Sequence, residues 1–114
     1  MLREVRVRCG STYLGISTVA LTELLVGAYR GSSEAQKRRQ EFIAQMMLDV
    51  PTHAYSLAIA ELAARNGGEQ AALGQTIPPI DLAIGATALS LNFSIFTANV
   101  RHFRMIPGLH VIPF

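Results

Sequence analysis

Segments that favour β-strands alternate with segments that favour helices along this chain, and this alternation limits the folds that it can adopt. The strand-like runs, rich in β-branched, aromatic and aliphatic residues, cover residues 12–17, 93–99 and 109–114, and the connector 49–53 can carry another. The helical segments cover residues 17–31, 32–50, 54–68 and 79–92, with a short helical turn at 100–106. Such alternation predicts an α/β fold with a mainly parallel sheet.

Residues that favour helix ends divide this pattern further. Two helical segments begin with residues whose side chains cap helix N-termini, namely Ser17 or Thr18 and Ser32 or Ser33. Gly31 and the Asn66–Gly68 triplet carry C-terminal signals, so the third helix is predicted to end at the triplet and to be followed by a loop. Pro79 suits the first turn of the fourth helix, and Asn92 suits its end. The apolar face predicted for the second helix consists of Phe42, Ile43, Met46 and Met47.

The size and composition of the chain fit one small domain spanning residues 1–114. Half of the 114 residues are hydrophobic and only 16% are charged, which argues against disorder. The net charge of +2 permits binding of nucleic acid without requiring it. Cys9 is the single cysteine, so no internal disulfide can form, and this fits a cytoplasmic protein. Because no run of about 18 apolar residues occurs, we expect no transmembrane helix and no membrane association.

Two of the eight acidic residues stand out because apolar residues flank both of them. Glu23 lies in "ALTELLVG" and Asp81 in "PPIDLAIG", each near the start of a helix, while Thr97 and Asn99 end a strand. Sites in parallel α/β folds form at the carboxyl ends of strands, so these segments could converge on one sheet edge. Glu23 and Asp81 would then bind Mg²⁺, which prefers oxygen ligands and activates water for attack at phosphorus. The simpler alternative is that Asp81 only complements its helix dipole and that Glu23 is an exposed surface acid.

Other chemistries find less support in the sequence. Neither a G-x-S-x-G motif, a P-loop nor a G-x-G-x-x-G motif is present. The three histidines lack metal-ligand spacing with one another and with Cys9; they are His53, His102 and His110.

Two blocks of the sequence resemble a known family. "ISTVALTELLVGA" and the later "IDLAIGATALSLNFSIFTANVRHFRMIPGLHVIPF" are similar to PIN-domain ribonucleases, specifically to VapC-type toxins of bacterial toxin–antitoxin pairs. The more specific block is the second, in which an acid opens a helix, a strand ends in Thr-x-Asn, and x-x-His-Phe and a Pro-Gly-Leu turn follow. The resemblance runs from about Tyr13 to Phe114.

The resemblance implies a three-layer α/β/α fold and an endoribonuclease that depends on Mg²⁺ or Mn²⁺. It also implies an RNA substrate, a homodimer and a cognate antitoxin that blocks the active site. Glu23 matches the acid of the family's "T-x-x-E-L" helix, and Asp81 matches the acid that opens the later helix. Thr97 and Asn99 match the polar pair at the strand end near the metal. The resemblance therefore assigns catalytic roles to these residues and metal binding to Glu23 and Asp81.

The chain departs from the family pattern at two places. The family opens with a central strand that ends in Asp-Thr-Asn, whose Asp is a metal ligand, and no such motif occurs here. We therefore expect the chain to be short at its N-terminus and to lack this first central strand, which would expose the edges of its neighbours. The fourth acidic position falls at His102, which either contacts phosphate when protonated or, more simply, caps the short helical turn.

Two functions from different classes follow. The first is a metal-dependent endoribonuclease toxin in which Glu23 and Asp81 bind the cation. The second is a catalytically inactive PIN-like relative that captures an antitoxin through apolar helices around Leu24–Tyr29 and Phe42–Met47.

Overall fold

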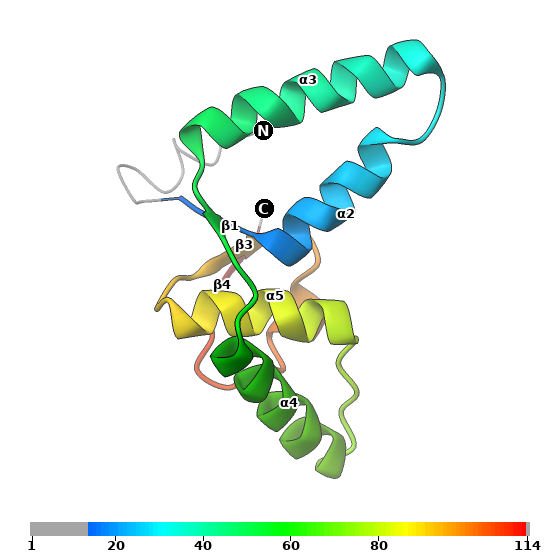
Figure 1. Ribbon diagram of the computed structural model, residues 1–114. Helices are drawn as coiled ribbons and strands as arrows, with labels where there is room; N and C mark the ends of the chain where they lie inside the picture. Colours follow the sequence, from blue (N-terminus) through cyan, green and yellow to red (C-terminus); the bar gives the residue numbers. More distant parts are fainter. Residues whose placement is uncertain (1–13, 114) are drawn as a thin grey trace. The chain divides into compact units, whose positions relative to one another are not determined.

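The computed structural model describes residues 14–113, which fall into two compact units divided between Ala54 and Tyr55 (Figure 1). The first unit contains β1 (Ile16–Ser17), α2 (Thr18–Ala28), α3 (Ser33–Asp49) and β2 (Thr52–His53). The second contains α4 (Leu57–Ala72), α5 (Pro79–Ser90), β3 (Ile95–Thr97), α6 (Val100–Phe103) and β4 (Val111–Pro113). None of the described helices is long and apolar enough to cross a membrane.

In the first unit, two helices connect a pair of parallel strands. Ile16 of β1 pairs with Thr52, and Ser17 pairs with His53. The Ser17 hydroxyl also caps α2 by accepting a hydrogen bond from the Ala20 backbone N–H at 3.0 Å. Ser32 caps α3 in the same way, so both predicted N-caps are confirmed. The core of this unit contains Ala28, Ile43, Met46 and Val50.

The turn between α2 and α3 is held by side chains of α3. The Arg39 guanidinium donates hydrogen bonds to the Gly27 and Arg30 carbonyl oxygens, each at 3.1 Å, and so satisfies the C-terminal end of α2. The predicted apolar face of α3 is confirmed for the buried Ile43 and Met46. It is wrong for Phe42 and Met47, whose exposed fractions are 57% and 44%, because the helical period gives the centre of an apolar face but not its width.

The second unit packs helices against a second pair of parallel strands. Ile95 of β3 pairs with Val111 of β4, and Thr97 pairs with Pro113. One buried cluster joins the strands to α6 and consists of Ile77, Ile95, Phe103 and Ile106; another lies between α4 and α5 and contains Ile59, Ala63 and Ala86. The two parallel pairs confirm the predicted α/β class. The predicted loss of an N-terminal strand concerns residues outside the described range.

Helix α4 continues beyond the end predicted for it. It runs through Asn66–Gly68 to Ala72 and ends where Gly74 has a φ of 80°. The prediction was wrong because Gly67 serves packing rather than termination: a Cβ atom built on it would lie 2.7 Å from Leu82 Cδ1 of α5. The loop before α5 is therefore much shorter than predicted. At the other end of α5, Asn92 has a φ of 59°, which confirms the predicted helix end.

The two adjacent glycines of α4 provide a matched test of this packing. A Cβ atom on Gly68 would have no neighbour within 4 Å, so Gly68→Ala should stabilise the protein by about 0.5–1 kcal/mol through helix propensity alone. Gly67→Ala should give no gain, since the new methyl group must displace the Leu82 side chain. Chemical denaturation of both variants measures the difference. Equal stabilisation by both changes would contradict the close approach of α4 and α5.

Candidate active site

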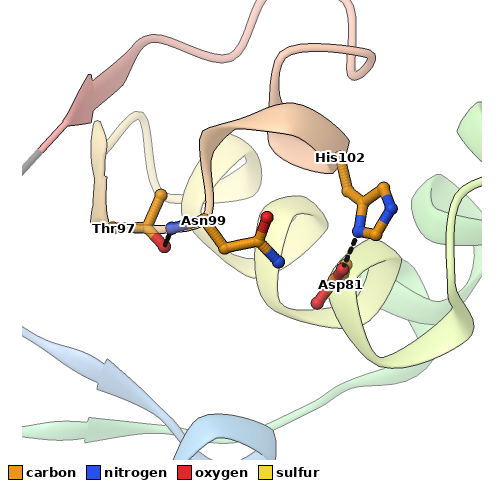
Figure 2. A network of polar contacts seen from close by, with 4 residues as sticks. All are labelled: Asp81, Thr97, Asn99 and His102. Carbon is orange, nitrogen blue, oxygen red and sulfur yellow. Dashed lines mark hydrogen bonds and ion pairs between the residues drawn. The ribbon is translucent and has the colours of Figure 1, made fainter.

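Figure 2 shows four polar side chains of the second unit in two contacts, one between Asp81 and His102 and one between Thr97 and Asn99. Asp81 belongs to the first turn of α5, Thr97 ends β3, Asn99 precedes α6, and His102 belongs to α6. Three of them, Asp81, Thr97 and Asn99, are residues that the sequence singled out. They come together because α5, β3 and α6 follow one another with short connections, so that one stretch of chain supplies the whole group.

Asp81 and His102 form the most direct contact of the site. The His102 Nδ1 atom lies 2.8 Å from Asp81 Oδ2, and the two side chains are 27% and 19% exposed. An ionised carboxylate can only accept hydrogen bonds, so His102 Nδ1–H is the donor. The imidazole therefore binds the carboxylate, and the expectation that it caps its own helical turn was wrong.

The turn from Thr97 to Asn99 positions a third polar side chain of the site, that of Asn99. The Asn99 backbone N–H donates a hydrogen bond to Thr97 Oγ1 at 3.0 Å, a local bond that closes the turn between β3 and α6. Figure 2 shows the Asn99 carboxamide extending from this turn toward the Asp81–His102 pair. Thr97 thus shapes the turn, and Asn99 offers both a donor and an acceptor beside the carboxylate.

Close packing of α5 against the segment that begins with α6 keeps the pair together. A Cβ atom on Gly85, one turn after Asp81, would collide with Ile106 Cδ1 and lie 3.5 Å from Phe103 Cδ1. Ile106 and Phe103 are 2% and 5% exposed, so the apolar core fixes this approach. Since His102 immediately precedes Phe103, the same packing holds its imidazole over the first turn of α5.

Glu23, the other predicted metal ligand, belongs to the first unit. It lies in α2 between Thr22 and Leu24, and its side chain is exposed. Within residues 14–113, no group of three or more His, Cys, Asp or Glu side chains gathers as a metal cluster would. In the second unit the oxygen atoms of Asp81 and Asn99 are nevertheless the donors that Mg²⁺ prefers, and this ion needs only one or two protein carboxylates.

Sequence reasoning missed the pairing of His102 with Asp81. The two residues are 21 positions apart, on different helices, and their spacing matches no local hydrogen-bonding pattern. The only signal available was the family resemblance, in which His102 falls at the fourth acidic position of the pattern.

Comparison with known proteins identifies the family to which this fold belongs. A family model described as the PIN domain matches residues 4–109 and so spans both units. A protein named Ribonuclease VapC from Rickettsia bellii is 32% identical over 107 residues, which cover 85% of this chain and 73% of that protein. Ribonuclease VapC1 from Rickettsia felis is 29% identical over 106 residues, with the same coverage of both chains.

Solved structures show the same architecture. The structure of VapBC2 from Rickettsia felis bound to a DNA fragment from their promoter matches with a TM-score of 0.86 at 19% identity, covering 99% of this chain and 84% of that one. The DNA-bound VapBC from Salmonella typhimurium matches with a TM-score of 0.85 at 26% identity, covering 98% and 83%. These matches confirm the resemblance inferred from the two sequence blocks.

Proposed function

Because this chain belongs to the PIN-domain family, we propose that it is a metal-dependent endoribonuclease that acts as the toxin of a type II toxin–antitoxin pair. One observation carries the proposal: Asp81 lies in the first turn of α5, in one group with Thr97, Asn99 and His102. The relatives named as ribonucleases support RNA as the substrate.

Asp81 and, by family resemblance, Glu23 would hold Mg²⁺ or Mn²⁺. When bound, such a cation would polarise the phosphate and favour attack by water at phosphorus. The protein side chains orient the substrate around it. Asn99 can donate its carboxamide N–H to a phosphate oxygen, and Thr97 keeps the turn in the shape that presents Asn99. Asp81 supplies the negative charge that attracts the cation.

The short helix α6 also offers positive charge for an RNA backbone. Arg101 and Arg104 are exposed and lie on either side of His102 and Phe103 in the sequence. Guanidinium groups bind phosphate with a planar fork of donors, so these two residues are suited to contact the RNA near the carboxylate. Together with the net charge of +2, this favours a polyanionic substrate.

The partners proposed for the chain are an antitoxin and a second copy of itself. The structures of VapBC complexes support an antitoxin partner, and a homodimer follows from the family resemblance. Such a toxin would act on RNA in the cytoplasm.

A second candidate is a catalytically inactive relative that binds an antitoxin. It is favoured by exposed apolar side chains of the first unit: Leu24 on α2, Tyr29 directly after α2 and Phe42 on α3 are 44%, 64% and 57% exposed. Exposed aromatic and aliphatic residues on neighbouring helices are suited to an apolar helix of a partner. Capture of an antitoxin is compatible with both functions, so RNA cleavage must distinguish them.

Cleavage of a mixed cellular RNA sample by the purified 114-residue chain tests the proposal. We expect cleavage with Mg²⁺, its loss with EDTA and its recovery when Mn²⁺ is added in excess, because a hard cation would supply the charge needed at the phosphate. Circular dichroism of the same sample verifies folding. A folded chain that cleaves no RNA with either metal, yet still binds its antitoxin, would favour the second candidate.

A further inference from the structure

We propose that His102 is a positioning residue for Asp81, which it orients by donating its Nδ1–H to Oδ2 so that Oδ1 is presented to the cation. This inference rests on the proposed function, whose metal site includes Asp81. It assigns to a histidine a task distinct from direct contact with substrate or metal.

The geometry of the pair supports an orienting role. The separation of 2.8 Å between Nδ1 and Oδ2 is that of a strong hydrogen bond to a charged acceptor. Figure 2 shows the second carboxylate oxygen of Asp81 pointing away from the imidazole. A carboxylate held at one oxygen loses rotational freedom about its terminal bond, and so its other oxygen is fixed in one direction.

The segment of α6 that carries the imidazole is held in place by apolar packing. His102 precedes Phe103, which is 5% exposed and packs in the cluster that also contains Ile106. Packing of Phe103 fixes the backbone of α6, so binding of the carboxylate has only the side-chain torsions of His102 left to order.

The pairing also fixes the tautomer of His102. A neutral imidazole carries one proton, and donation from Nδ1 places it there, leaving Nε2 with a lone pair. This tautomer is a spectroscopic signature that a merely space-filling histidine would not show. Its observation requires neither substrate nor metal.

Three substitutions separate orientation from packing. His102→Asn carries an amide donor at about the position of Nδ1, whereas His102→Gln carries it nearer to Nε2, and His102→Ala carries none. His110→Ala is the matched control, since His110 Nδ1 pairs with Ser94 Oγ at 2.9 Å and not with Asp81. Calorimetric titration of each folded variant with Mn²⁺ measures affinity, and RNA cleavage is measured in parallel.

We expect His102→Ala and His102→Gln to weaken Mn²⁺ binding by roughly 10–100-fold, the usual effect of removing a hydrogen-bond partner of a metal ligand. His102→Asn should stay within about threefold of the wild type, as should His110→Ala. Long-range ¹H–¹⁵N spectra of the metal-free protein, at a pH where histidine is neutral, should show the Nδ1–H tautomer at His102. Asp81→Ala should shift it toward the Nε2–H form.

Several results would overturn the inference. These are an Nε2–H tautomer in the wild type, unchanged Mn²⁺ affinity in His102→Ala, and equal losses in His102→Asn and His102→Ala. The proposed function would survive them if the wild type still bound Mn²⁺ and cleaved RNA. A folded wild type that binds no Mn²⁺ and cleaves no RNA would instead overturn the proposed function, whatever the tautomer of His102.

Discussion

Asp81→Ala is expected to lower kcat/KM for RNA cleavage by more than about 100-fold, since loss of a ligand should exceed the roughly 10–100-fold effect of losing a ligand's partner. Asp81→Asn should lose nearly as much activity. Its amide oxygen can still accept the hydrogen bond from His102 Nδ1–H, which lies 2.8 Å from the native oxygen, but the negative charge is gone. Comparing Asp81→Asn with Asp81→Ala therefore separates the effect of the negative charge from the effect of the side-chain shape.

The fold should survive both substitutions. The Asp81 side chain is 19% exposed and His102 is 27% exposed, so water can replace the lost partner at a cost of about 1 kcal/mol. Glu69→Gln is a suitable control, because Glu69 is an exposed acid on α4 in the same unit. Initial rates on a labelled RNA, with melting temperatures of all variants, provide the measurement. Robust Mg²⁺-dependent cleavage by Asp81→Ala would rule out a role for this carboxylate.

Of the substitutions considered, Gly85→Ala should lower the free energy of unfolding the most. The added methyl group would collide with Ile106 Cδ1 and lie 3.3 Å from Leu109 Cδ2. Overpacking of this kind costs about 1–3 kcal/mol, and the better helix propensity of alanine offsets up to about 1 kcal/mol of it. Because Ile106 is 2% exposed, it has little room to turn aside. We expect a net loss of about 1–2 kcal/mol and a melting temperature lower by roughly 5–10 °C.

A double-mutant cycle identifies the cause. Ile106→Val removes the Cδ1 atom with which the methyl group would collide, at a cost of about 0.5–1.5 kcal/mol on its own. If the collision determines the loss, Gly85→Ala in the Ile106→Val background should cost clearly less than in the wild type. Additive losses would show that residue 85 and residue 106 do not oppose each other. Gly85→Ala should also reduce RNA cleavage, since displacing α6 moves His102 relative to Asp81.

Local signals in the sequence predicted the framework of this protein well. The caps at Ser17 and Ser32 and the turn residue Asn92 act on the backbone within a few positions, so their residue types suffice. The same signals predicted the α/β class, and the two longer sequence blocks predicted the family. Asp81, Thr97 and Asn99 were singled out because they flank predicted strand and helix ends, and their roles stay predictions.

Predictions failed where a distant residue decides the outcome. Gly67 looks like a helix terminator, but Leu82 of another helix explains it. His102 looks like a residue that caps its own turn, but Asp81 is its partner. No residue type reveals such a partner without the packing of α4, α5 and α6. The catalytic and metal-binding roles of Glu23 and Asp81 stay predictions that the proposed experiments address.

The order of the site residues along the chain has a consequence for how the protein assembles. Asp81 and His102 are separated by 21 positions, whereas the β1–β2 pair joins Ile16 to Thr52, across both helices of the first unit. Closing a shorter loop costs less chain entropy, and contacts between nearby residues favour rapid folding. The polar group around α5 therefore belongs to the part of the chain that can order early. Once the segment that ends near Ile106 has folded, His102 can already orient the Asp81 carboxylate.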